Sequence, residues 1–136
     1  MKYVLDTNAL SALMKGDARA LARLRAAGRA ETGIPQPVIA EIEYGIARLP
    51  RSKRRQALQD RFDLLRAELP RCQWTDTVSE RFGAIKASLE HKGQRIEDFD
   101  AAIAAHALAD GSSLVTADLV HMVRVPGLTV EDWIAE

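Results

Sequence analysis

Four acidic residues stand where the sequence around them is apolar. Asp6 ends the short apolar run at residues 2–5, and Glu41 lies within an apolar helical segment. Asp100 heads the apolar face of an alanine-rich segment, and Asp118 closely follows another apolar run. Four carboxylates gathered at one place would repel one another, and at least one would take up a proton. A divalent cation that prefers oxygen ligands, Mg²⁺ or Mn²⁺, would relieve that repulsion, bind phosphate oxygens and orient an attacking water.

Each acid taken alone also has a structural explanation. Asp6 suits the N-cap of a helix that begins near Ala9, a role that Thr7 or Asn8 could fill instead. Asp118 would equally cap a short helix at residues 119–123. The case for a metal site therefore rests on the set of four acids.

Helical spacing separates Glu41 from Glu43. Two residues along a helix correspond to a rotation of ~200°, so the two carboxylates cannot face one site. Gly45 lies on the same face as Glu41, where a glycine costs helix stability but leaves the backbone approachable. We therefore expect Glu41 to face inward and Glu43 to face solvent.

The alanine-rich segment poses the same choice between Asp98 and Asp100. Asp98 suits the N-cap of this helix, and Asp100 its first turn, where the helix dipole favours a carboxylate. Asp100 heads the more apolar face, which carries Ile103 and Ala107. Asp100 is therefore the candidate site residue of the pair.

The elements that would position these acids alternate between strands and helices. Apolar runs predict strands at residues 2–5, 32–35, 72–74, 113–116 and 128–130, and periodic apolar stripes predict helices at residues 9–16, 18–27, 36–49, 52–69, 76–92 and 98–109. This order favours an α/β fold: a single domain over residues 1–136, with a short, mostly parallel central sheet flanked by helices. Such sheets bind ligands outside the carboxyl ends of their strands, where Asp6 and Asp118 lie.

Composition limits the classes of protein. Of 136 residues, 19 are basic and 19 acidic, and this balance argues against a protein that coats nucleic acid by bulk attraction. Residues 1–71 hold 14 basic and 8 acidic side chains, a net charge of +6, and residues 72–136 carry the opposite charge. One half could attract a polyanion, or the halves could pair across the fold.

Cys72, the single cysteine, excludes an internal disulfide. No apolar stretch suits a membrane span or a signal peptide, so we expect a cytoplasmic protein without membrane contact.

Several motifs, in order along nearly the whole chain, resemble those of a known family. They are Val4-Leu5-Asp6-Thr7-Asn8, Ala40-Glu41-Ile42-Glu43-Tyr44-Gly45, the segment from Asp100 to Leu108, Leu114-Val115-Thr116-Ala117-Asp118, and Val125-Pro126-Gly127-Leu128. Together they resemble the PIN-domain ribonucleases, and most closely the VapC toxins of toxin–antitoxin pairs. Two positions depart from or vary within that pattern: Met122 stands where relatives often have Phe, and relatives carry either Asn or Asp at position 118.

The resemblance implies a PIN fold and a metal-dependent endoribonuclease that acts as the toxin of a toxin–antitoxin pair. The acidic metal site would consist of Asp6, Glu41, Asp100 and Asp118, with Mg²⁺ or Mn²⁺ as cofactor. Supporting polar residues would be Thr7, Asn8 and Thr116, and Asp98 would assist through a metal-bound water. The reaction expected is hydrolysis of an RNA phosphodiester by a metal-activated water, which leaves a 5′-phosphate and a 3′-hydroxyl.

The same resemblance implies several partners: an RNA substrate, a cognate antitoxin, and a second copy of the chain, within a homodimer or a higher toxin–antitoxin assembly. Basic side chains in the first half of the chain are candidates for contact with the RNA backbone: Lys15, Arg19, Arg51, Lys53, Arg54 and Arg55. The cluster at residues 53–55 would equally suit the solvated start of a helix.

Two rival functions compete with the nuclease. A receiver-type signalling domain would need a lysine after a late strand, and no lysine follows Lys92, so this class fits poorly. The second rival is a catalytically silent PIN-like module, which has the same fold and binds RNA or a protein partner but does not cleave RNA. The complete set of acids speaks against this second rival.

Overall fold

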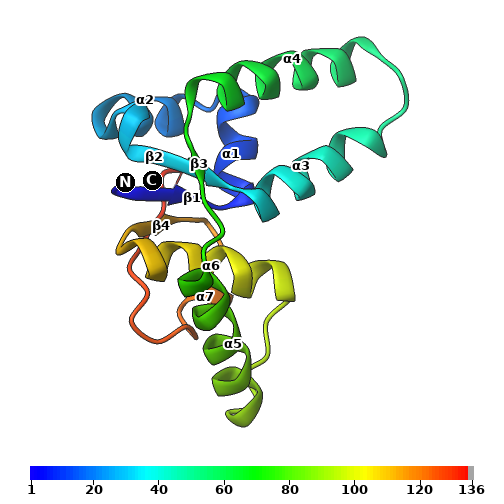
Figure 1. The fold of residues 1–136 in the computed structure, drawn as a ribbon. Helices are drawn as coiled ribbons and strands as arrows, with labels where there is room; N and C mark the ends of the chain where they lie inside the picture. Colours follow the sequence, from blue (N-terminus) through cyan, green and yellow to red (C-terminus); the bar gives the residue numbers. More distant parts are fainter. Residues whose placement is uncertain (135–136) are drawn as a thin grey trace.

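The computed structural model describes residues 1–134, which form a five-stranded sheet with helices on both faces (Figure 1). The sheet order is β3-β2-β1-β4-β5, and every neighbouring pair is parallel. The strands are β1 (Tyr3–Leu5), β2 (Thr32–Pro35), β3 (Arg71–Cys72), β4 (Ser113–Val115) and β5 (Val130–Glu131). The predicted α/β fold with a parallel sheet is therefore confirmed.

Seven α-helices connect these strands. They are α1 (Thr7–Met14), α2 (Ala18–Ala27), α3 (Gln36–Ala47), α4 (Lys53–Glu68), α5 (Asp76–His91), α6 (Asp98–Asp110) and α7 (Leu119–Met122). In Figure 1, α1, α2 and α4 lie on one side of the sheet, and α5, α6 and α7 lie on the other. The ribbon of β2 leads directly into α3, which forms a hairpin with α4 (Figure 1).

Burial explains why the first strand takes the central place. Val4 and Leu5 are both fully buried, as is Leu114 in the neighbouring β4. A strand covered by helices on both faces has no side that tolerates polar residues, so its sequence reads as a continuous apolar run. The polar residues that follow β1 and β4 therefore reach the edge of the sheet together.

Most of the predicted strands and helices are present. Some of them begin or end at other residues than predicted, because contacts with distant parts of the chain set their boundaries. The first helix begins at Thr7 rather than near Ala9, because Asp6 caps it and accepts a hydrogen bond from the Thr7 backbone N–H. The N-cap of α6 is Glu97 rather than Asp98, whose carboxylate pairs with Lys86 of α5. The third and fifth strands lie at 71–72 and 130–131, set by pairing with β2 and β4.

The prediction of one domain over residues 1–136 includes two residues, 135–136, that lie outside the described part of the chain. Within residues 1–134, no helix combines the length and apolar character that a membrane crossing requires.

Gly33 permits close packing in the middle of the sheet. A Cβ at this position would overlap Met1 Sδ and would lie 2.6 Å from Cys72 Sγ. Both positions are well inside van der Waals distance, and Cys72 is buried. The two sulfur atoms therefore occupy the space that any larger residue would need.

We expect Gly33→Ala to lower the free energy of unfolding by about 1–3 kcal/mol, the usual cost of overpacking a core. Gly83→Ala is the matched control, because Gly83 is exposed in α5 and a Cβ there meets nothing within 4 Å. The control should gain about 0.5–1 kcal/mol from helix propensity. Urea denaturation of both variants checks the prediction, and a Gly33→Ala protein as stable as the wild type would contradict it.

Candidate active site

The four candidate carboxylates line one cavity of about 530 Å³. Asp6 comes from the end of β1, Glu41 from α3, Asp100 from the first turn of α6 and Asp118 from the segment after β4. Four segments that are distant in sequence thus contribute one acid each to the carboxyl edge of the sheet. The rest of the lining includes the cations Lys15, Arg48 and Arg54 and an apolar wall formed by Met14, Ile42, Ile46, Leu49 and Leu58.

Asp6 is the most deeply buried of these acids, with 3% of its surface exposed. Its Oδ1 accepts a hydrogen bond from the Thr7 backbone N–H at 2.7 Å. Its Oδ2 accepts one from Thr116 Oγ1 at 2.7 Å and one from Asn8 Nδ2 at 3.4 Å. Burial raises the pKa of Asp6, and the charges of Glu41 and Asp118 raise it further, while the hydrogen bonds from Thr116 and Thr7 counteract the shift. Asp6 therefore combines both roles considered for it, helix cap and cavity carboxylate.

Thr116 links the two strand ends that carry Asp6 and Asp118. Besides donating to Asp6, its Oγ1 accepts hydrogen bonds from Asn8 Nδ2 at 3.2 Å and from the Asp118 backbone N–H at 2.9 Å. Asn8 completes the link, since its Oδ1 accepts from the Ala117 backbone N–H at 2.8 Å. The supporting polar role predicted for Asn8 and Thr116 thus corresponds to a network of hydrogen bonds that fixes β1 against β4.

Glu41 faces the cavity, as its position opposite Glu43 predicts. Its Oε1 accepts a hydrogen bond of 2.5 Å from Thr7 Oγ1, which explains how Thr7 supports the site. Gly45 lines the same cavity. Glu43 is exposed and pairs with Arg66 of α4 at 3.3 Å.

Asp100 experiences the combined charge of the other acids. Burial raises its pKa to about 6, and the charges of Asp6, Asp118 and Glu41 each add to the increase. Within residues 1–134, no ion pair joins Asp6, Glu41 or Asp100 to a cationic side chain. The carboxylates are therefore close enough to repel one another, and among the described residues Asp6, Glu41 and Asp100 have no cationic side chain in direct contact.

Asp118 caps α7 and contacts a histidine that sequence reasoning did not select. Its Oδ1 accepts from the His121 backbone N–H at 3.2 Å, and His121 Nδ1 lies 2.9 Å from Oδ2. The spacing of three residues across a helix N-terminus was the available signal, because it places the two side chains on one face.

Asp98 lies apart from the carboxylate cavity. It forms an ion pair with Lys86 at 3.1 Å and lines a neighbouring cavity that shares Asp100 with the main one.

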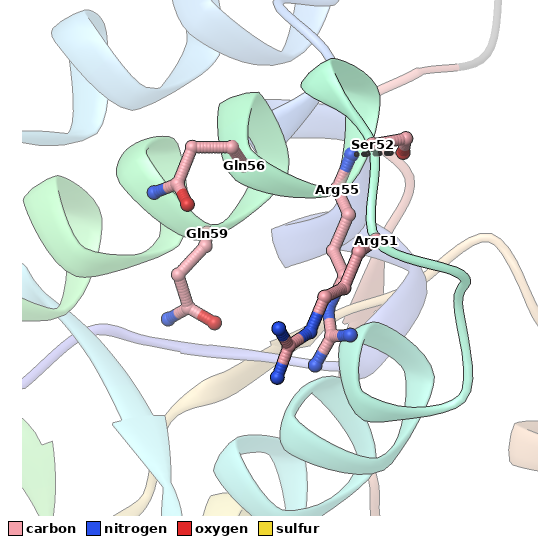
Figure 2. A pocket seen from close by; sticks show the side chains of 5 residues that line it. All are labelled: Arg51, Ser52, Arg55, Gln56 and Gln59. Atoms are coloured by element: carbon pink, nitrogen blue, oxygen red, sulfur yellow. Dashed lines mark hydrogen bonds between the residues drawn. The ribbon is translucent and has the colours of Figure 1, made fainter.

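The basic residues predicted to contact RNA lie in different places, and only some of them line the carboxylate cavity. Lys15 and Arg54 line the carboxylate cavity, whereas Arg51 and Arg55 line a separate cavity beside α4 (Figure 2).

Two further basic candidates lie elsewhere. Lys53 lines neither of these two cavities. Arg19 of α2 donates a hydrogen bond to the backbone carbonyl of Ile134, near the other end of the chain. Arg48, which ends α3, lines the carboxylate cavity instead.

The donor set fits a hard divalent cation. All four acids offer oxygen, the ligand atom that Mg²⁺ and Mn²⁺ prefer, and their mutual repulsion is what such a cation would relieve. In residues 1–134, no three acidic, histidine or cysteine side chains are arranged closely enough to enclose a metal ion. In proteins, Mg²⁺ usually keeps several waters and is bound through one or two carboxylates.

The raised pKa of Asp100 makes stability depend on pH. The folded protein binds the Asp100 proton more tightly than the unfolded chain, so the free energy of unfolding falls as the pH rises from about 4 to about 6 and is level above. In EDTA at pH 7.5, Asp100→Asn should therefore be more stable than the wild type, by about 1 kcal/mol after allowing for solvent screening. Asp98→Asn, outside the cavity, should show no gain. Thermal unfolding across this pH range checks both, and an Asp100→Asn protein less stable than the wild type at pH 7.5 would contradict the prediction.

Comparisons with known proteins match this chain over nearly its whole length. The family model of the PIN domain matches residues 3–128. Ribonuclease VapC2 of Rickettsia felis is 30% identical over 135 residues, covering 98% of each chain. The tRNA(fMet)-specific endonuclease VapC of Salmonella typhimurium is 27% identical over 133 residues, again covering 98% of each. A crystal structure of VapBC2 from Rickettsia felis bound to a DNA fragment superposes with a TM-score of 0.86 at 28% identity, covering 98% of this chain and 99% of that one. The chain therefore belongs to the PIN-domain family, among the proteins of the VapC type.

Proposed function

We propose that this protein is the toxin of a VapBC-type toxin–antitoxin pair and acts as an endoribonuclease that requires Mg²⁺ or Mn²⁺. One observation carries the proposal: four carboxylates from four distant segments line a single cavity that also exposes Lys15 and Arg54. Relatives named ribonuclease and endonuclease, aligned over 98% of the chain, support RNA as the substrate.

The cations of the cavity would bind the substrate backbone. Lys15 and Arg54 can each contact a phosphate oxygen, and such contacts supply a salt-sensitive share of RNA affinity. Arg48 of the same lining adds a third positive charge. The acids and cations together would hold a phosphodiester at the carboxyl edge of the sheet.

The carboxylates of Asp6, Glu41, Asp100 and Asp118 would together hold the metal ion, directly or through the waters that Mg²⁺ keeps. When bound, Mg²⁺ or Mn²⁺ supplies neutralisation of the phosphate charge and activation of the attacking water. Thr116 and the Thr7 backbone N–H keep Asp6 oriented, and Thr7 Oγ1 keeps Glu41 oriented. Hydrolysis in this site would leave a 5′-phosphate and a 3′-hydroxyl: the oxygen of a water bonds to phosphorus, the bond from phosphorus to the 3′ oxygen breaks, and that oxygen leaves with a proton as the 3′-hydroxyl.

An antitoxin and a second copy of the chain are the protein partners we propose. The Rickettsia felis structure is a VapBC2 assembly on promoter DNA, and this chain superposes on 99% of the matched chain. A toxin held in such an assembly would be inactive until the antitoxin is removed. We propose the homodimer as the basic unit, within the cytoplasm.

Removing one carboxylate should abolish cleavage without unfolding the protein. We expect Asp6→Asn and Glu41→Gln each to lower the rate of RNA cleavage by more than the ~100-fold typical of an outer-shell partner. Asn caps a helix as well as Asp does, so α1 should persist in Asp6→Asn. Glu43→Gln is the matched control, because Glu43 lies on the opposite face of the same helix.

The assay is cleavage of total RNA with Mg²⁺, with Mn²⁺ and with EDTA, followed by mapping of the new 5′ ends. Cleavage that continues in EDTA would exclude a metal-dependent nuclease. If the wild type binds RNA but cleaves it no faster than Asp6→Asn does, the protein is a binding module and not a nuclease.

Thr116 should act on the site through Asp6 and Asp118. Thr116→Val keeps the shape of the side chain but removes the hydroxyl that bonds to both residues. We expect a loss of about 10–100-fold in cleavage rate and a weaker response to Mg²⁺, as is usual for partners that orient a metal ligand. Thr116→Ser should restore most of both, and a valine variant with normal Mg²⁺ dependence would contradict this role.

A further inference from the structure

A second cavity, of about 410 Å³, lies beside the first turns of α4. Its lining contains no apolar residue and consists of Arg51, Ser52, Arg55, Gln56 and Gln59. Figure 2 shows the side chains of Arg51 and Arg55 extending in the same direction, and both line this cavity. Ser52 caps α4 by accepting a hydrogen bond of 3.1 Å from the Arg55 backbone N–H, which fixes the start of the helix.

The charges in this cavity lack a counter-ion. Arg55 Nη1 donates to the Leu49 carbonyl at 3.2 Å, and within residues 1–134 neither Arg51 nor Arg55 pairs with a carboxylate. Two guanidinium groups that line one cavity repel each other, and a bound anion would replace this repulsion with attraction to both groups. A phosphate suits the site because each guanidinium offers several N–H donors in a fork that matches its oxygens.

The two glutamines leave acceptor atoms available. Gln56 donates its amide nitrogen to Asp60 at 2.8 Å, and Gln59 donates to Asp63 at 2.9 Å, one helical turn further on in each case. Each bond uses one of the two amide N–H donors and leaves the amide oxygen unused. The cavity therefore offers donors for a phosphate and acceptors for hydroxyl or amino groups beside it, as a nucleotide requires.

This cavity adjoins the carboxylate cavity through α4 and the segment before its cap. Arg54 and Leu58 line the carboxylate cavity, while their neighbours Arg55 and Gln59 line the second one. Leu49 forms part of the wall between them, because it lines the carboxylate cavity and its carbonyl holds Arg55. The two cavities therefore lie on neighbouring faces of the first turns of α4.

We propose that the cavity of Arg51, Arg55, Gln56 and Gln59 is a second RNA site, which binds a backbone phosphate of the substrate strand outside the carboxylate cavity. The proposal rests on the proposed function, since the ligand is the RNA that the nuclease would cut. RNA is favoured over a protein partner because the lining is polar throughout, whereas protein interfaces bury an apolar core. The enzyme would thus hold its substrate at two separate points of the backbone.

The test measures RNA binding apart from cleavage. Asp6→Asn protein is titrated against an end-labelled 20-nucleotide oligouridylate by fluorescence anisotropy at several salt concentrations. Arg51→Ala/Arg55→Ala is added to this background. The matched control is Arg25→Ala/Arg81→Ala, which removes the same charge from exposed arginines that line neither cavity. Arg51→Ala alone, paired with Arg25→Ala, covers the case in which removal of the Arg55 bond to Leu49 disturbs the fold.

We expect the cavity double variant to weaken binding about tenfold and to reduce the salt slope by about 0.7 for each backbone phosphate that the variant no longer binds. The control should change both quantities much less. An equal weakening in the control would assign the effect to bulk charge and overturn the proposal, as would unchanged RNA binding. Impaired antitoxin binding with intact RNA binding would also overturn it.

Cleavage of total RNA by the wild type separates the two proposals. If the wild type does not cleave RNA, the nuclease function is wrong. If it does cleave while the cavity variants bind RNA normally, the second site alone is wrong.

Discussion

Repulsion among four carboxylates at one edge of a small parallel sheet is the interaction on which the rest of the site depends. Asp6 is held at 3% exposure while the charges of Glu41 and Asp118 raise its pKa. Hydrogen bonds from Thr7 and Thr116 oppose that shift and hold the carboxylate in place. The fold thus uses buried hydrogen bonds to keep acids together that would otherwise separate.

The same repulsion among the acids bears on where the cationic side chains lie and which of them form ion pairs. Arg54 and Lys15 line the carboxylate cavity without forming ion pairs with Asp6, Glu41 or Asp100. A direct pair would neutralise the acids that are proposed to hold a metal ion. Other charges are satisfied away from the site, as Arg66 is by Glu43 and Arg23 by Glu131. The positive charge of the first half is therefore only partly paired across the fold.

The strands, the helices and the inward choice of Glu41 could be predicted from the sequence, because periodicity and burial decide them locally. Asp98 shows where that reasoning fails. Its type and spacing suit an N-cap, but Lys86 of another helix takes its carboxylate, and only the packing of α5 on α6 brings the two together. Helical spacing turns the adjacent residues Arg54 and Arg55 ~100° apart, but local sequence could not show that one face meets the carboxylate cavity and the other a separate cavity.

The central position of β1 has a consequence for the order in which the protein is made. Strand β1 pairs with β4, and Asp6 accepts a hydrogen bond from Thr116, which lies 110 residues later in the chain. Contacts this distant in sequence cannot form until the later partner exists, and chains emerge from the ribosome N-terminus first. The acidic cluster is incomplete until Asp118 has been added, so a growing chain that has not reached this residue carries no finished site. The proposed nuclease therefore has no complete set of acids while its N-terminal half is being synthesised.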